Sequence, residues 1–151
     1  MCLHMEGLDM FRFHISMLVA LVVATISVSS AEDYVVPDGV TVLTEEQLLK
    51  QAVGNTFMND RWTEYWEPPA SNEKKGKSKG KFRGTAYGGG WEVKKSLICF
   101  HWDLASLAKY NGICYMIALD GVNATWYNTD GSTYYPRGGR IKMSNGNPNN
   151  F

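Results

Sequence analysis

Cys99, His101 and Asp103 are the residues whose types and spacing come closest to a catalytic arrangement. They occupy every second position, so on an extended strand their side chains share one face. A histidine beside a thiol or a carboxylate can serve acid–base or nucleophilic catalysis. A half-exposed strand face that carries a disulfide explains the same row, and this interpretation is preferred. We therefore expect no catalytic residue and keep a small hydrolase using His101 only as the third hypothesis.

Metal and cofactor chemistry has little support in the sequence. His101 is the only histidine after residue 31, and no HExxH, CxxC or GxSxG pattern is present. Zinc would therefore need carboxylates or the cysteines as its remaining ligands. We expect no metal site and no cofactor.

Residues 1–31 are typical of a bacterial signal peptide. Residues 15–28 are apolar, follow Arg12 and His14, and end before a small-residue segment. An uncleaved anchor is the alternative, and Met10 is an alternative start. The chain is expected to be periplasmic or secreted, with no transmembrane segment after cleavage. Residues 32–151 keep 14 of 15 basic and 13 of 15 acidic residues, so this single β-rich domain is close to neutral.

Cleavage would remove Cys2 and leave Cys99 and Cys114. In an oxidising compartment two thiols pair, which predicts a Cys99–Cys114 disulfide across a loop of about 15 residues, worth about 3 kcal/mol. The alternatives are two buried free thiols, or a reactive or metal-binding cysteine.

Aromatic and basic residues are the other candidates for function. Four tryptophans, in different expected strands except for the first two, either fill the core or line a cavity for an apolar or sugar ligand: Trp62, Trp66, Trp91 and Trp126. For a small barrel the core interpretation is preferred. A basic cluster could contact polyanions: Lys74, Lys75, Lys77, Lys79, Lys81 and Arg83. Glycine and serine interrupt it, so we expect residues 67–81 to be a flexible, solvated loop and expect no specific nucleic-acid partner.

The elements that would position these residues are one helix and a series of short strands. Thr44 and Gln47 form a capping box, Leu43 and Leu48 a hydrophobic staple, and Gly54 ends the helix. Expected strands cover 55–58, 61–66, 82–87, 91–95, 97–102, 113–119, 122–127, 132–135 and 139–143. Asp-Gly turns at 120–121 and 130–131 predict a three-stranded meander. The fold class is mainly β, a small antiparallel barrel or sandwich with a lipocalin-like meander and one N-terminal α-helix.

A set of short motifs occurs in an order that resembles a known family. They are Gly54-Asn55-Thr56, Glu64-Tyr65, Gly89-Gly90-Trp91, Leu97-Ile98-Cys99-Phe100, Cys114-Tyr115, Leu119-Asp120-Gly121, Thr125-Trp126-Tyr127, Asp130-Gly131 and Gly146-Asn147-Pro148-Asn149. Together they resemble small exported bacterial proteins grouped as domain of unknown function number nine hundred and ninety-five, over residues 48–151. The resemblance implies a secreted or periplasmic, mostly β protein, and it supplies no activity or catalytic residues. The lysine-rich segment departs from the family pattern.

Three functions remain open at this point. The first is a non-enzymatic module that binds a small ligand or an envelope component, based on the aromatic content and the missing catalytic motifs. The second is a structural or protein-interaction role in the cell envelope, through a strand edge or the lysine-rich segment. The third is the small hydrolase that would use His101.

Overall fold

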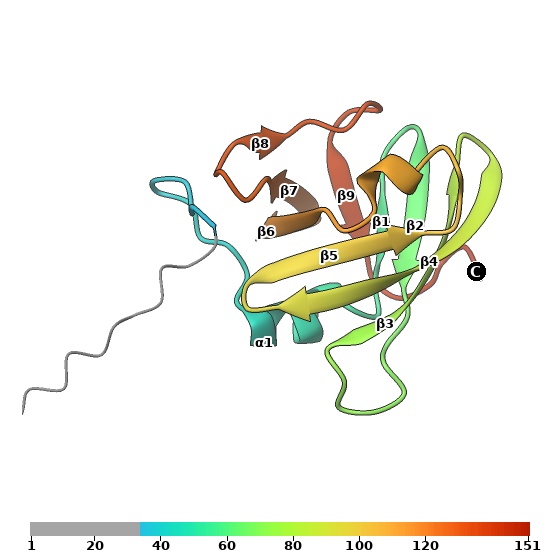
Figure 1. The fold of residues 1–151 in the computed structure, drawn as a ribbon, viewed down its shortest axis with the longest axis horizontal. Coiled ribbons are helices and arrows are strands. Elements are labelled where there is room, and N and C mark those ends of the chain that lie inside the picture. The colour runs from blue at the N-terminus through green and yellow to red at the C-terminus, as the bar shows by residue number, and fades with distance from the viewer. Residues whose placement is uncertain (1–33) are drawn as a thin grey trace, which may run out of the picture. The chain divides into compact units, whose positions relative to one another are not determined.

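A computed structural model describes residues 34–151, and Figure 1 shows their fold. The signal peptide expected at 1–31 lies outside the described residues. No helix in 34–151 has the length and apolar character needed to cross a membrane.

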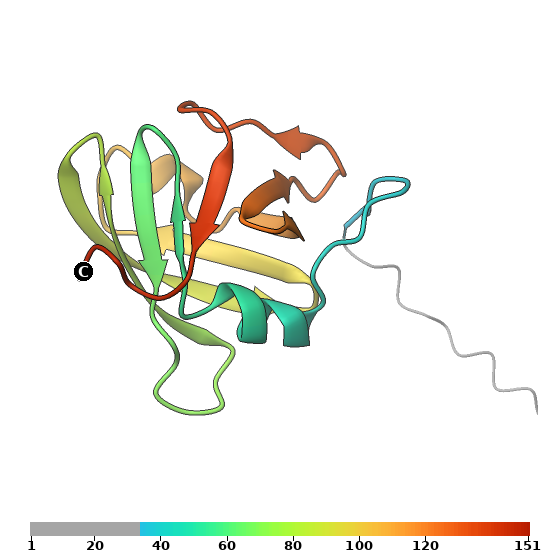
Figure 2. The same cartoon turned by 180° about the vertical axis from the view of Figure 1, so that it is seen from behind.

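Eight antiparallel strands close into a β-barrel. In ring order they are β1 (Thr56–Met58), β2 (Trp62–Trp66), β3 (Lys75–Phe82), β4 (Thr85–Lys94), β5 (Leu97–Trp102), β6 (Cys114–Asp120), β7 (Asn123–Tyr127) and β9 (Ile141–Ser144). Figure 2 shows β9 beside β1, the pairing that closes the ring together with β7–β9 and β6–β7. The short strand β8 (Thr133–Tyr134) pairs only with β7. The expected antiparallel barrel is confirmed.

Strand alternation produces an aromatic core. On β5, Phe100 and Trp102 are buried while His101 between them is exposed. Ring centroids of Phe57 and Trp66 lie 4.0 Å apart, and those of Phe100 and Trp126 lie 5.5 Å apart. Such pairs add to the stabilisation from burial, so the centre of the barrel is a continuous aromatic cluster.

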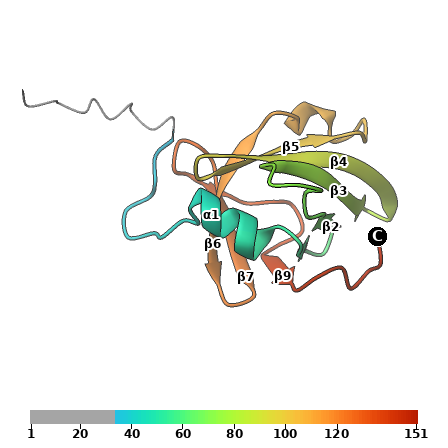
Figure 3. The same ribbon diagram turned by 90° about the horizontal axis from the view of Figure 1, so that it is seen from below.

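The helix covers one end of the barrel. It consists of α1 (Glu45–Gln47) and a π-helical turn, η1 (Leu48–Ala52). The capping box is confirmed, because the Gln47 amide donates to Thr44 Oγ1 and the Thr44 amide donates to Gln47 Oε1. Leu48 and Ala52 are fully buried in the same core as the barrel residues. Seen from below, the helix lies across the barrel end (Figure 3).

The lysine-rich segment differs most from expectation. The sequence predicts a flexible loop over residues 67–81, but from Lys75 onward they form β3, which pairs with β4 along its length and with β2 from Ser78 to Phe82. The predicted strand at 82–87 is also wrong, because Arg83 and Gly84 form the turn between β3 and β4. Gly76, Ser78 and Gly80 face inward on β3 while the lysines between them are exposed. The strand therefore forms without apolar residues before Phe82.

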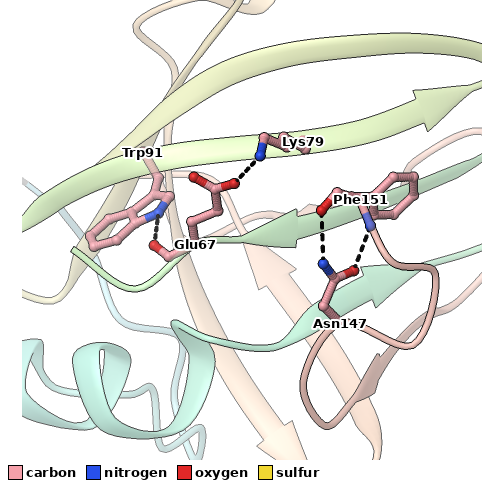
Figure 4. Close-up of polar contacts among 5 residues, drawn as sticks. All are labelled: Glu67, Lys79, Trp91, Asn147 and Phe151. Atoms are coloured by element: carbon pink, nitrogen blue, oxygen red, sulfur yellow. Dashed lines mark hydrogen bonds and ion pairs between the residues drawn. The ribbon is translucent and has the colours of Figure 1, made fainter. Parts of the chain in front are cut away.

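Hairpin turns connect the last strands of the barrel, and a C-terminal tail follows β9. The meander β6–β7–β8 is confirmed, although the first turn centres on Gly121-Val122 rather than Asp120-Gly121, since Asp120 pairs with Asn123. After β9 the tail is held by Asn147, whose side-chain amide and carbonyl bond the Phe151 carbonyl and amide, both at 3.0 Å (Figure 4).

Candidate ligand cavity at the open end of the barrel

A cavity of about 250 Å³ lies at the barrel end opposite the helix. The β1–β2 and β3–β4 turns and the β5–β6 connection, which contains η2 (Ala108–Tyr110), surround this end (Figure 1). Half of its sixteen lining residues are aromatic: Trp62, Phe82, Tyr87, Trp102, Tyr110, Tyr115, Trp126 and Tyr134. The cavity is partly open, and it combines aromatic with charged and polar side chains, as small-molecule sites do.

Glu64 is the polar centre of this cavity. Its side chain is only 2% exposed, and it points inward from the middle of β2. The Tyr87 hydroxyl donates to Oε2 at 2.7 Å, and Trp102 Nε1 donates to both carboxylate oxygens at 3.0 and 3.2 Å. These three residues come from three different strands, β2, β4 and β5.

Burial raises the pKa of Glu64 above its ordinary value, and the hydrogen bonds from Tyr87 and Trp102 oppose that shift. Ser78 and Trp66 also lower this pKa, although Ser78 Oγ and Trp66 Nε1 have no partner within hydrogen-bond distance. Burial likewise raises the pKa of Tyr87, and the nearby Glu64 carboxyl adds to this. The Tyr87 hydroxyl therefore stays protonated and acts as a donor.

Trp126 presents a hydrogen-bond donor without an acceptor. It lines the cavity, is 3% exposed, and its Nε1 has no partner. A buried donor without an acceptor costs about 1–3 kcal/mol. An acceptor atom supplied by a bound molecule or by water would remove this cost.

The predicted ligand-lining tryptophans separate into two groups. Trp62 and Trp126 line the cavity. Trp66 is fully buried against Phe57 and belongs to the core. Trp91 is buried away from this cavity, where its Nε1 donates to the Glu67 carbonyl at 3.1 Å (Figure 4).

The predicted basic cluster is not one contiguous site. Four lysines, Lys75, Lys77, Lys79 and Lys81, are exposed in a row along the outer face of β3. Within that row Lys79 pairs with Glu67 (Figure 4), and Lys74 before the strand pairs with Glu45. Arg83 belongs to the barrel mouth instead.

A second, larger hollow of about 760 Å³ lies on the outer face of β3–β5. Lys77, Gly90, His101 and the cysteines contribute to its lining, and so do acidic residues such as Glu67 and Glu92. The His101 side chain is exposed and makes no hydrogen bond or ion pair with any described residue. We favour the barrel mouth as the ligand site, because it reaches the buried polar groups of Glu64, Tyr87 and Trp102, whereas the charged side chains of the outer hollow are partly or fully exposed.

The disulfide between Cys99 and Cys114 is present. The two residues face each other directly on β5 and β6, and Cys99 shares the outer face with His101. No group of three or more His, Cys, Asp or Glu side chains that could hold a metal ion occurs within 34–151.

Sequence reasoning missed Glu64, Tyr87 and Trp102 as a group. One signal was available, because Trp62, Glu64 and Trp66 have the same parity on one strand, which places a glutamate in an inward aromatic row. The comparisons add no further information: no known protein family, curated protein sequence or solved structure matches the chain. The resemblance to the domain of unknown function therefore stays a prediction.

Proposed function

We propose that this chain is an exported, non-enzymatic module that binds a small ligand in the cavity at the open end of its barrel. The observation that carries the proposal is the cavity itself, where eight aromatic side chains and the buried Glu64 line one hollow at the end of the barrel. The volume of about 250 Å³ is just below the usual range for small-molecule sites. The ligand is therefore small.

An occluding variant tests this proposal. Ser106 lines the cavity mouth and is exposed, so Ser106→Trp blocks entry without changing the core. Ser71→Trp, at an exposed serine that does not line this cavity, is the matched control.

Native mass spectrometry of the protein purified from the envelope of its own cells supplies the readout. A small molecule retained by the wild type and by Ser71→Trp, but absent from Ser106→Trp, supports the proposal. Equal retention by all three proteins places the ligand elsewhere, and no bound molecule on the wild type contradicts the proposal.

The alternative, an envelope protein that interacts through a strand edge, has less support. Every strand of the ring has a paired neighbour on each side, although β6 pairs with β5 only at Cys114 and Tyr115, and β8 with its two residues is paired on one side alone. An edge this short offers few backbone groups to a partner strand.

A further inference from the structure

Four cationic side chains surround the mouth of the cavity: Arg61, Arg83, Lys109 and Arg137. They come from the β1–β2 turn, the β3–β4 turn, η2 and the β8–β9 connection. The two turns are joined, because the Arg83 amide donates to the Arg61 carbonyl at 2.8 Å. Segments that are distant in the sequence thus place positive charge at one opening.

None of these four cations forms an ion pair with another described residue. Arg83 lies over the Phe82 ring at 5.5 Å and Lys109 over the Tyr110 ring at 5.0 Å, both of which line the same cavity. Stacking on a ring fixes a cation without neutralising it. The four cations of the mouth are therefore not paired with any carboxylate of the described residues.

The single acidic residue in the lining does not change this balance. Glu64 already accepts hydrogen bonds from Tyr87 and Trp102, and it lies at the buried end. Asp60 and Asp103 are the sequence neighbours of lining residues but do not line the cavity themselves. The Asp103 carboxylate accepts a hydrogen bond from the Gly88 backbone amide. A ligand thus meets aromatic walls and cations around the opening.

We propose that the ligand is a small apolar monoanion, a carboxylate with an aromatic or comparably compact body. This inference rests on the proposed function and specifies the chemistry of the same cavity. The body packs against Trp62, Tyr115 and Tyr134, and the carboxylate lies among the cations of the mouth. Guanidinium groups suit this role because they bind carboxylates in a bidentate manner.

Three matched probes test the head group: 3-phenylpropanoate, its neutral amide, and 3-phenylpropylamine. Isothermal titration calorimetry measures their affinities, and tryptophan fluorescence gives an independent signal. We expect the anion to bind at least about tenfold more tightly than the amide and the amine to bind weakest. The advantage of the anion decreases as salt is added, since exposed charges are screened.

The variant Arg61→Gln/Arg83→Gln is expected to remove most of the advantage of the anion and to leave the amide unchanged. Arg140→Gln, at an exposed arginine outside the cavity, is the matched control and leaves all three affinities unchanged. Circular dichroism confirms that each variant is folded.

The outcomes separate the two proposals. If the amide and the anion bind equally and Ser106→Trp blocks both, the cavity binds ligands but the head-group inference is wrong. Tightest binding of the amine also overturns the inference and identifies Glu64 as the counter-ion. Failure of all three probes to bind contradicts the inference, whereas the proposed function is contradicted only if the wild type also retains no molecule in native mass spectrometry.

Discussion

Glu64 makes the pH dependence of stability a direct test of the site. Burial raises its pKa above the ordinary value of 4.5, so the native state holds a proton that the unfolded chain releases more readily. Between 4.5 and the higher native pKa, unfolding releases this proton, and the free energy of unfolding falls as the pH rises. Below pH 4.5 Glu64 is protonated in both the native and the unfolded state, and its burial no longer lowers the free energy of unfolding in this way. Glu64 therefore destabilises the barrel at neutral pH relative to acid pH.

The variant Glu64→Gln keeps the size of the side chain and removes its titration. We expect the wild-type free energy of unfolding, minus that of the variant, to decrease with rising pH above about 4.5. One proton sets a limit of about 1.4 kcal/mol per pH unit. Urea unfolding from pH 3.5 to 8, followed by tryptophan fluorescence, measures this difference, and other titrating groups cancel in it.

Glu46→Gln provides a control of opposite sign. Glu46 is exposed on the helix, and its hydrogen bond to Lys50 lowers its pKa. Its contribution is present above its ordinary pKa and is lost as the pH falls, so the corresponding difference rises with pH. A flat or rising difference for Glu64→Gln would refute the reasoning, because it would mean that Tyr87 and Trp102 outweigh the effect of burial.

Three further predictions concern the stability of the barrel. Cys99→Ser/Cys114→Ser removes the disulfide over a 15-residue separation and should lower the free energy of unfolding by about 3 kcal/mol, measured by urea unfolding; an unchanged midpoint contradicts this. Thr44→Ala breaks the capping box and should cost about 1 kcal/mol, whereas Thr44→Ser should keep most of the stability in the same assay. Gly80→Ala places a Cβ against the backbone of β2 and should cost about 1–3 kcal/mol. Gly90→Ala, where the nearest atom would be 3.2 Å away, should cost less, and equal thermal stability of the two variants would argue against this packing.

Local patterns in the sequence were sufficient to predict the fold class and several elements. The capping box of Thr44 is a contact within four residues, and the alternation around His101 follows from strand geometry alone. The Cys99–Cys114 pairing followed from the expected export and the count of two cysteines after cleavage. Each of these inferences needed only neighbouring residues or a count, so the missing tertiary information did not matter.

Strand β3 could not be predicted in this way, because its reason lies on other strands. A Cβ at Gly76 would lie 2.6 Å from the Trp91 ring. A Cβ at Gly80 would lie 2.7 Å from the Tyr87 hydroxyl oxygen. The inward positions of β3 are therefore small to accommodate large side chains from β4. From sequence alone, alternating lysine and glycine indicates a solvated loop, since neither residue favours strands.

This packing also links the stability of the barrel to the proposed ligand site. Gly80 leaves room for the Tyr87 ring, and in this position the Tyr87 hydroxyl donates to Glu64 at the polar end of the cavity. A methyl group at Gly80 would displace the Tyr87 ring and weaken this hydrogen bond. Gly80→Ala should therefore lower the affinity for 3-phenylpropanoate as well as the stability, and it should do so for the amide too, because the change is at the buried end. Unchanged affinity in a destabilised Gly80→Ala protein would show that the ligand does not reach Tyr87.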